Sequence, residues 1–455
     1  MTTTAAEIAH HAGGVVTGAP DAVVTSWAFD SRALDPGACF VALNGDRDGH
    51  DFVAAAFAAG ATVAMVSRPL PGVTPPPGAA LVQVDDVLRR LQELAGAARI
   101  ARPELRVVAV TGSAGKTSTK DLLAAILAPL GCYASPASYN NEFGLPITLL
   151  NAPADVGVVV AEMGERYPGD IAALCAIARP AVGIVTNVGF AHAEHLGGPE
   201  GAANAMGEML AALPAGGLAV LNADDEWTPT LAAAPGVDVV TVGTAAGADY
   251  RIEDIELDEH LHPTFVLSGR RFEVPLHGEH QVVNAALAVV AAHVGFGVDL
   301  DLAAGALAAV RPASWRLELQ ITPDGVTILN DAYNANPASM DAALRALARI
   351  PTTGRRIAVL GEMHELGTHS GEAHAAVGRR VAELGIDVLI GVGAGGRAIA
   401  DAASVAVAEI SFADDAGEAL SVVAAVAVAG DTVLVKASRA VGLEVVAVQL
   451  LRAAS

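Results

Sequence analysis

The sequence predicts an α/β protein of three domains. Buried apolar runs alternate with helical stretches along most of the chain, a pattern typical of parallel sheets that helices cover. The length of 455 residues corresponds to roughly three domains of about 150 residues each. Breaks that contain proline occur at 101–103 and at 311–312. We therefore expect domains at 1–103, 104–311 and 312–455.

In the first domain, short apolar runs at 61–67 and 80–84 predict strands, with a proline-rich surface loop between them. The next stretch, 85–100, predicts a helix, because Val87, Leu91 and Leu94 recur on one face. The helix should end at the break around Pro103.

The second domain begins with a continuous apolar strand at 106–111, which runs into a glycine turn and a helix from Lys116. The sequence predicts further strands at 156–161, 182–186 and 218–221, and a helix rich in alanine and valine at 280–293. The alternation favours a parallel sheet.

The third domain repeats this alternation. The sequence predicts strands at 326–331, 356–361, 387–393 and 432–437. A helix should open at Asn336 and Pro337, because asparagine is a good N-cap and proline suits the first helical position. Met340, Leu344 and Leu347 then form an apolar stripe that we expect to lie in the core.

The composition restricts the possible partners. Apolar residues make up 53% of the chain, which supplies buried cores, and the formal net charge is −23, which disfavours nucleic acid and anionic membranes as partners. The longest apolar runs are too short to span a bilayer, and the first residues lack the pattern of a signal peptide. The three cysteines have no metal-ligand spacing. Their scattered placement fits a reducing cytoplasm.

The strongest local motif follows the strand at 106–111 and opens the next helix. Such a glycine turn lets backbone N–H groups approach a phosphate, while Lys116 reaches the terminal phosphates and Thr117 can bind Mg²⁺. Val110 replaces the first glycine of the strict P-loop pattern. However, only three of the 27 basic residues are lysines, and two of them lie in or beside this motif. The predicted nucleotide-binding residues here are Gly112, Ser113, Ala114, Gly115, Lys116, Thr117 and Ser118.

Two more polar groups follow predicted strands of the same domain. Glu162 ends the second strand, where a carboxylate suits Mg²⁺ but is also common as a solvated strand end. His192 closes the segment 186–192. Its imidazole can bind a metal, transfer a proton or cap the loop, and the sequence alone leaves these roles open.

The third domain carries three candidate groups. The segment 330–337 is dense in amides, which suits either a turn or ligand recognition. Lys436, Ser438 and Arg439 follow a strand and could bind anions. Arg316 is either a phosphate-directed cation or a surface arginine packed on Trp315.

Taken together, the motifs resemble the Mur ligases of peptidoglycan synthesis over nearly the whole chain. They are the P-loop, Tyr139-Asn140-Asn141, Glu162-Met-Gly, 187–192, Gly278-x-His280-x-x-x-Asn284, Arg316, Asp331 to Pro337, Gly361-Glu-Met-x-Glu-Leu-Gly367 and Lys436-x-Ser438-Arg439. The segments 331–337 and 361–367 resemble the members that add D-alanyl-D-alanine. Near the N-terminus, Asp30-Ser31-Arg32, 40–45 and Asp48-Gly49-His50 resemble a uridine-nucleotide-binding domain.

The resemblance implies a small uridine-nucleotide-binding α/β domain, a central P-loop ATPase domain and a C-terminal Rossmann-like domain. It implies a cytoplasmic ATP- and Mg²⁺-dependent ligase that makes peptidoglycan precursors, and so serves cell-wall biogenesis, cell shape and division. ATP would phosphorylate the carboxylate of UDP-N-acetylmuramoyl-tripeptide, and the amine of D-alanyl-D-alanine would attack the acyl phosphate.

The resemblance also implies residue roles. Lys116, Glu162 and His192 would be catalytic, with Thr117 and Glu162 on one Mg²⁺ and His192 on a second. ATP would be bound by the P-loop together with Asn284, Arg316, Asp331, Tyr333 and Asn334. Substrate would contact Ser31, Arg32, Asn44, Gly45, Asn140, Asn141, Asn336, Lys436, Ser438 and Arg439.

The chain departs from the family's pattern at several positions. Met206 stands where relatives carry a lysine that is carbamoylated to bridge the second Mg²⁺, and Glu165 stands where small or amide residues are common. Gln281 and Ala437 are milder changes. Met206 therefore leaves open a nucleotide-binding paralogue with reduced activity. A MurE-like ligase that adds an amino acid, a folylpolyglutamate synthase and a generic P-loop ATPase or kinase are further alternatives, and the motifs outside the P-loop disfavour the last two.

Overall fold

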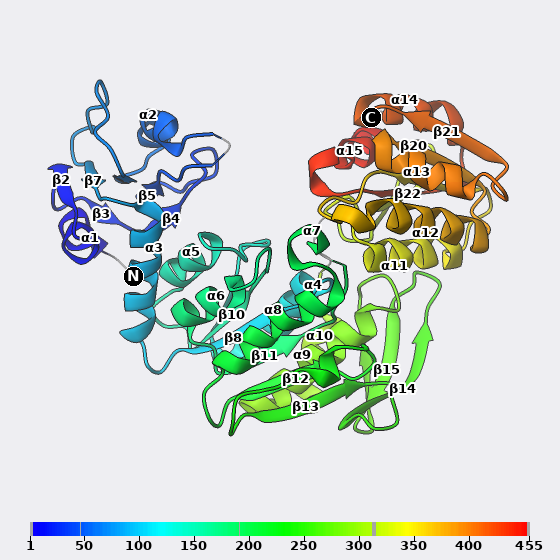
Figure 1. The fold of residues 1–455 in the computed structure, drawn as a ribbon, viewed down its shortest axis with the longest axis horizontal. Helices are drawn as coiled ribbons and strands as arrows, with labels where there is room; N and C mark the ends of the chain where they lie inside the picture. Colours follow the sequence, from blue (N-terminus) through cyan, green and yellow to red (C-terminus); the bar gives the residue numbers. More distant parts are fainter. Residues whose placement is uncertain (1–2, 46, 191, 312–314, 453–455) are drawn as a thin grey trace.

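The computed structural model describes residues 3–45, 47–190, 192–311 and 315–452. Within them, three sheets of five, nine and six strands follow one another along the chain, besides one two-stranded pair. Figure 1 shows the N-terminal and C-terminal sheets on opposite sides of the central one. The predicted α/β class is confirmed. The domain limits stay a prediction, and residues 312–314 at the second limit lie outside the described residues.

The N-terminal sheet has the order β2-β7-β6-β5-β4, in which only β2 is antiparallel to its neighbour. The elements of the N-terminal domain are β1 (Thr3–Thr4), α1 (Ala5–Ala12), β2 (Val15–Gly18), β3 (Val23–Val24), β4 (Ser26–Ala28), β5 (Ala38–Val41), α2 (Val53–Ala58), β6 (Val63–Val66) and β7 (Ala80–Gln83). Strands β1 and β3 form the separate two-stranded pair. The two predicted strands in this part are thus confirmed as β6 and β7. The parallel strands β4 and β5 place the loops that follow them at one edge of the sheet.

The central sheet has the order β16-β15-β14-β13-β12-β11-β8-β10-β9. Its strands are β8 (Arg106–Thr111), β9 (Cys132–Ala134), β10 (Val158–Glu162), β11 (Val182–Val185), β12 (Leu218–Asn222), β13 (Asp238–Gly243), β14 (Tyr250–Leu257), β15 (Pro263–Leu267) and β16 (Arg270–Glu273). In this order, all neighbouring strands between β14 and β9, including β8, are parallel, as predicted. Antiparallel β15 and β16 extend the sheet, a feature that the sequence analysis did not predict.

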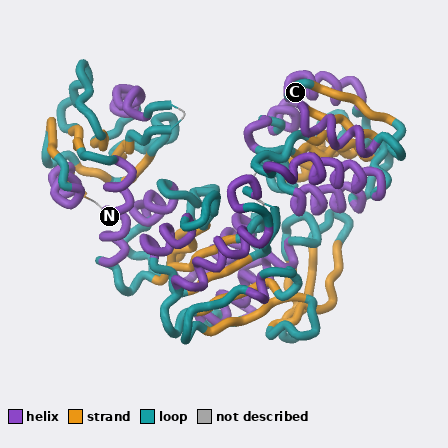
Figure 2. Tube along the Cα trace, viewed as in Figure 1, coloured by secondary structure: helices purple, strands orange, loops and turns teal. Residues whose placement is uncertain are grey.

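Helices cover both faces of the central sheet (Figure 2). They are α4 (Lys116–Leu127), α5 (Gly144–Asn151), α6 (Asp170–Ala178), α7 (Ala193–Leu196), α8 (Pro199–Ala212), α9 (Gln281–Phe296) and α10 (Leu300–Ala308). Val108 and Val110 of β8 pack on the face with α4, α9 and α10. Val107 and Ala109 pack on the face with α5, α6 and α8. Strand β8 is therefore buried from both sides, and its carboxyl end is fixed at the centre of the sheet.

The C-terminal sheet has the order β17-β18-β22-β19-β20-β21, with only β17 antiparallel. Its elements are β17 (Glu318–Ile321), β18 (Thr327–Asn330), α11 (Pro337–Arg349), β19 (Arg356–Leu360), α12 (Ser370–Glu383), β20 (Val388–Val392), α13 (Gly393–Ala403), β21 (Glu409–Ala413), α14 (Ala416–Val426), β22 (Thr432–Lys436) and α15 (Glu444–Arg452). The predicted start of α11 is confirmed: Asn336 is its N-cap and Pro337 its first residue.

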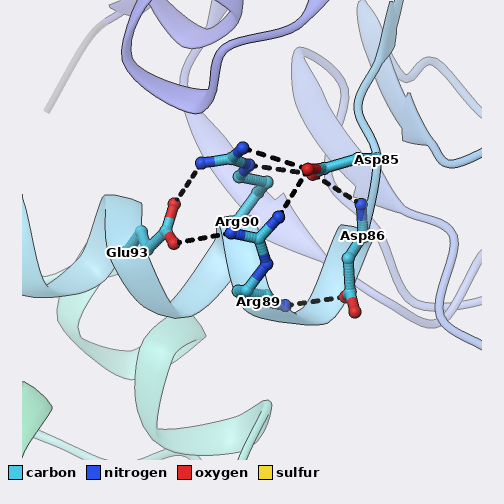
Figure 3. A network of polar contacts seen from close by, with 5 residues as sticks. All are labelled: Asp85, Asp86, Arg89, Arg90 and Glu93. Carbon is cyan, nitrogen blue, oxygen red and sulfur yellow. Dashed lines mark hydrogen bonds and ion pairs between the residues drawn. The ribbon is translucent and has the colours of Figure 1, made fainter.

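Helix α3 (Val87–Ile100) joins the first two domains. At its start, Asp86 accepts a hydrogen bond from the Arg89 backbone, and Arg89 and Arg90 pair with Asp85 and Glu93 (Figure 3). Farther along, α3 packs against α5 and α6 of the central domain, with Ala95 in their common core. The helix therefore belongs to both domains and fixes their relative position.

Every helix in the described ranges falls short of the length and apolar character that crossing a membrane requires.

Candidate functional site

The phosphate-binding loop leaves the carboxyl end of β8, and two glycines in it have backbone angles that favour glycine. Gly112 has φ of 140° and Gly115 has φ of 80°. A Cβ on Gly112 would collide with the Thr186 hydroxyl, and one on Gly115 would collide with the Asn284 amide oxygen. Helix α4 then begins at Lys116. Its amino end therefore lies at the loop, where the helix dipole favours an anion.

Asn187 holds this loop in place. The Asn187 carboxamide accepts a hydrogen bond from the Ala114 N–H at 3.0 Å and donates one to the Ala114 carbonyl at 2.9 Å. The Ser113 N–H donates to the Asn187 carbonyl. The Ser113 hydroxyl in turn accepts a hydrogen bond from the Gly189 N–H at 2.7 Å. The segment that follows β11 thus holds the phosphate loop in position through these hydrogen bonds.

Glu162 and Thr117 form a cluster of oxygen atoms at the end of β10. The Thr117 hydroxyl donates to one oxygen of Glu162 at 2.8 Å, and the Asn140 amide donates to the other at 2.8 Å. Glu162 is 1% exposed, so its carboxylate is held in a dry site. Carboxylate and hydroxyl oxygens are hard donors of the kind that Mg²⁺ prefers. The residues present therefore fit a Mg²⁺ held by Thr117 and Glu162.

Residues of the C-terminal domain face the phosphate loop and Thr117. The Arg316 guanidinium donates to the Thr117 hydroxyl at 2.8 Å and lies over the Tyr333 ring at 4.2 Å, while the Asn336 amide donates to the Ser113 carbonyl at 2.9 Å. The alternative that Arg316 packs on Trp315 is wrong, because Arg439 occupies that ring. Polar contacts between two domains thus close over the phosphate loop.

These contacts border a cavity of about 570 Å³. Its lining includes most of the predicted site residues: Ser113, Ala114, Gly115, Lys116, Thr117, Ser118, Asn140, Glu162, His192, Asn284, Arg316, Asp331, Tyr333, Asn334, Asn336, Lys436 and Arg439. Ser138 also lines it and lies 3.3 Å from the Thr117 hydroxyl. The sequence analysis missed Ser138, because a single serine in a loop carries no signal.

Lys436 and Asp331 form a buried pair at the cavity's edge. Their Nζ and Oδ2 atoms are 2.5 Å apart, and Lys436 also donates to the Asn334 carbonyl at 2.8 Å. Burial lowers the pKa of Lys436, and the Asp331 carboxylate opposes this shift. Lys436 therefore fastens the segment that carries Asp331 and Asn334. Its predicted role in binding substrate stays a prediction.

His192 faces a residue that the sequence analysis did not single out. Its Nδ1 atom lies 2.5 Å from a carboxylate oxygen of Glu365, and the other oxygen lies 2.9 Å from Arg166. His192 has φ of 51°, in the left-handed region. Glu365 was visible only as one letter of the motif 361–367, because the sequence does not show which side chains of the central domain face that motif.

Six predicted substrate residues line no part of this cavity. Ser31 and Arg32 follow β4, and Asn44 and Gly45 follow β5, so all four lie at one edge of the N-terminal sheet. Arg32 pairs with Asp30, and its hydrogen bonds lower the pKa of Asp30 to about 2. Ser438 is buried and accepts a hydrogen bond from the His364 N–H.

Asn141 also lies outside the cavity lining, and it accepts a hydrogen bond from the Gly144 N–H at 3.0 Å. The loop that carries it links the two regions. Its Tyr139 and Phe143 pack on Phe29, directly after β4, while its Asn140 binds Glu162.

Comparison with known proteins decides the family. Residues 110–292 match the Mur ligase middle domain, and residues 315–439 match the Mur ligase glutamate ligase domain. The chain belongs to the Mur ligase family. This Mur ligase is 41% identical over 426 residues to the UDP-N-acetylmuramoyl-tripeptide–D-alanyl-D-alanine ligase of Mycobacterium tuberculosis (strain ATCC 25618 / H37Rv), covering 86% of this chain and 83% of the relative. It is 36% identical to the Bacillus subtilis (strain 168) ligase of the same name, over 84% of this chain and 82% of the relative.

Solved structures agree. A crystal structure of MurF from Acinetobacter baumannii matches this Mur ligase with a TM-score of 0.85 and 29% identity over 99% of both chains. MurF from Thermotoga maritima, solved in complex with ADP, matches with a TM-score of 0.76 and 29% identity over 94% of this chain and 97% of that one. The matches support the predicted family and fold, while the roles of single residues stay predictions.

Proposed function

We propose that this Mur ligase joins D-alanyl-D-alanine to UDP-N-acetylmuramoyl-tripeptide, with ATP as the phosphoryl donor, in peptidoglycan precursor synthesis. Relatives at 36–41% identity over most of the chain carry this activity in their names. The observation that carries the proposal is the cavity in which Lys116 and Thr117 of one domain face Arg316 of the other. A phosphate chain bound there would be met by positive charge from both domains.

The chemistry follows from the residues. A carboxylate is a poor electrophile, so the tripeptide carboxylate attacks the γ-phosphorus of ATP, ADP leaves and an acyl phosphate forms. The dipeptide amine then attacks the acyl carbon, loses a proton, and phosphate leaves as the amide bond forms. Phosphoryl transfer requires positioning and neutralisation of charge, which Lys116 and Arg316 supply. When bound, Mg²⁺ neutralises phosphate charge, and Thr117 and Glu162 would hold it.

The remaining predicted residues fit separate parts of the substrates. Asn284, Asp331, Tyr333 and Asn334 surround the rest of the nucleotide cavity. Ser31, Arg32, Asn44 and Gly45 are proposed to bind the uridine nucleotide at the edge of the N-terminal sheet. Asn140, Asn141, Asn336, Lys436, Ser438 and Arg439 are proposed to contact the peptide or the acyl acceptor. We expect a cytoplasmic monomer.

Phosphate release tests the proposal. The purified chain is mixed with ATP and Mg²⁺, and each substrate is added alone and together. Phosphate release should require both UDP-N-acetylmuramoyl-tripeptide and D-alanyl-D-alanine, and it should stop when EDTA removes the metal. Release with a free amino acid and the UDP-N-acetylmuramoyl-dipeptide, in place of the tripeptide and D-alanyl-D-alanine, would indicate a MurE-like ligase. Release with neither substrate would indicate a generic ATPase, and none under any condition would indicate an inactive paralogue.

A further inference from the structure

Glu165 is a buried carboxyl group with one oxygen that lacks a partner. It lies in the loop that follows β10, is 2% exposed, and its Oε2 atom accepts a hydrogen bond from the Thr111 hydroxyl at 3.2 Å. Its Oε1 atom is buried without a hydrogen-bond partner. A buried polar oxygen without a hydrogen-bond partner is destabilising, so its presence points to a ligand that binds it.

The groups that act on Glu165 belong to the phosphate site. Burial raises the pKa of Glu165, and the nearby charges of Lys116 and His192 oppose that shift. Thr111, which binds its other oxygen, is the last residue of β8 before the phosphate loop. The carboxyl group therefore lies beside the loop. Arg166, the next residue, and His192 contact the two oxygens of the same Glu365 carboxylate, so the chain at Glu165 passes close to His192.

Three other groups of the central domain do not offer a free oxygen to the same place. Glu162 is already assigned, with Thr117, to the other cation. Met206 of α8 is fully buried in the core of this face and has only a soft thioether, which is a poor ligand for Mg²⁺. Glu208 accepts hydrogen bonds from the Gly169 and Ala172 N–H groups at the start of α6. Glu165 thus remains as the carboxylate with a free oxygen.

We propose that Glu165 is a ligand of a divalent cation that binds between it and His192, beside the terminal phosphate of the nucleotide. Within the described residues, no three acidic, histidine or cysteine side chains already surround one point. A cation here would take its other ligands from phosphate oxygens and water, as Mg²⁺ commonly does in sites that use one or two carboxylates. This site rests on the proposed function. It gives the second cation a carboxylate ligand, which the thioether of Met206 cannot provide.

The test counts bound cations without turnover. The full chain is titrated with Mn²⁺, in place of Mg²⁺, in the presence of β,γ-methylene ATP, and free Mn²⁺ is followed by electron paramagnetic resonance. Wild type should bind two Mn²⁺ per chain, one at Thr117 and Glu162 and one at Glu165 and His192. Glu165→Gln keeps the size of the side chain and removes the charge, so it should weaken the second Mn²⁺ about tenfold or more.

Two further variants complete the test. Glu208→Gln is the matched control, a carboxylate on the same face that already binds backbone N–H groups, and it should keep both Mn²⁺. His192→Gln should weaken the same Mn²⁺ as Glu165→Gln, which keeps the test decisive if one variant fails to fold. A single Mn²⁺ in wild type, or two in Glu165→Gln with unchanged affinity, would overturn the inference. Because no turnover is measured, this result is independent of the phosphate-release assay.

Discussion

Arg316 shows how one side chain serves both walls of the cavity. It binds the Thr117 hydroxyl and stacks on Tyr333, two contacts that a planar guanidinium makes together and an ammonium does not. We expect Arg316→Lys to lower kcat for phosphate release about tenfold or more, with little change in the thermal unfolding midpoint. Arg345→Lys, a half-exposed arginine on α11 paired with Asp341, is the control. A kcat within twofold of wild type would contradict this role.

Asp431, just before β22, makes a pH-dependent contribution to stability. Its carboxylate is 1% exposed and accepts hydrogen bonds from the Arg355 backbone and side chain and from the Val428 N–H. Burial alone would raise the pKa of Asp431, but these hydrogen bonds outweigh it and lower the pKa. The stabilisation is therefore complete above the unfolded-state pKa, about 3.9, and is lost as the pH falls through the folded-state value.

Asp431→Asn should consequently lower the free energy of unfolding by about 1–3 kcal/mol at pH 7. The difference from wild type should begin to shrink below about pH 4, where the carboxylate of the unfolded chain binds a proton, and it should go on shrinking as the pH falls through the lower folded-state pKa. Urea unfolding at several pH values measures both effects. A difference that stays constant down to pH 2 would show that the charge of Asp431 does not matter.

Among elements, α3 bears most on how the first two domains are joined. Beyond its last turn, Arg102 donates to the carbonyls of Ala152, Pro153 and Val156, which follow α5. We expect Arg102→Ala to lower the free energy of unfolding by about 1–3 kcal/mol, because three backbone carbonyls, two of them part-buried, lose their donor. Arg89→Ala removes an exposed pair at the other end of α3 and should cost less than about 1 kcal/mol. Equal losses in urea unfolding would argue against this docking.

The sequence predicts elements well where local rules decide them. Asn336 and Pro337 specify the start of α11, and the apolar run 106–111 becomes a strand buried on both faces. It predicts poorly what distant contacts decide. Strands β15 and β16 follow short turns instead of helices, and their antiparallel pairing depends on the edge that β14 provides. Similarly, Arg316 and Thr117 are 199 residues apart, so their contact exists only in the folded chain.

At the scale of the whole molecule, the two domain junctions differ in kind. The first and central domains share α3, and Asn151 of α5 exchanges two hydrogen bonds with the Trp27 backbone. The central and C-terminal domains meet around the cavity through polar contacts of Arg316, Asn336 and Glu365. Elsewhere they meet through the Glu279–Arg349 pair and through Leu261, which packs in the apolar core of the C-terminal domain. Polar contacts beside a ligand site can open and close at lower cost than a shared apolar core. We therefore expect the C-terminal domain to move against a unit formed by the other two.

Glu365 tests this view of closure. Its carboxylate contacts Arg166 and His192 of the central domain, and its backbone carbonyl accepts a hydrogen bond from the Glu194 N–H. Glu365→Gln keeps the shape of the side chain but removes the negative charge that attracts Arg166. Each partly exposed pair contributes up to about 1 kcal/mol, so nucleotide affinity should fall about three- to tenfold and the radius of gyration with bound nucleotide should increase. Calorimetric titration with β,γ-methylene ATP and small-angle X-ray scattering measure the two effects.

The control is Glu372→Gln, whose partner Arg379 lies on the same helix, and it should change neither the nucleotide affinity nor the radius of gyration. If Glu365→Gln binds nucleotide as tightly as wild type and is equally compact, the closed arrangement does not depend on the Glu365 carboxylate.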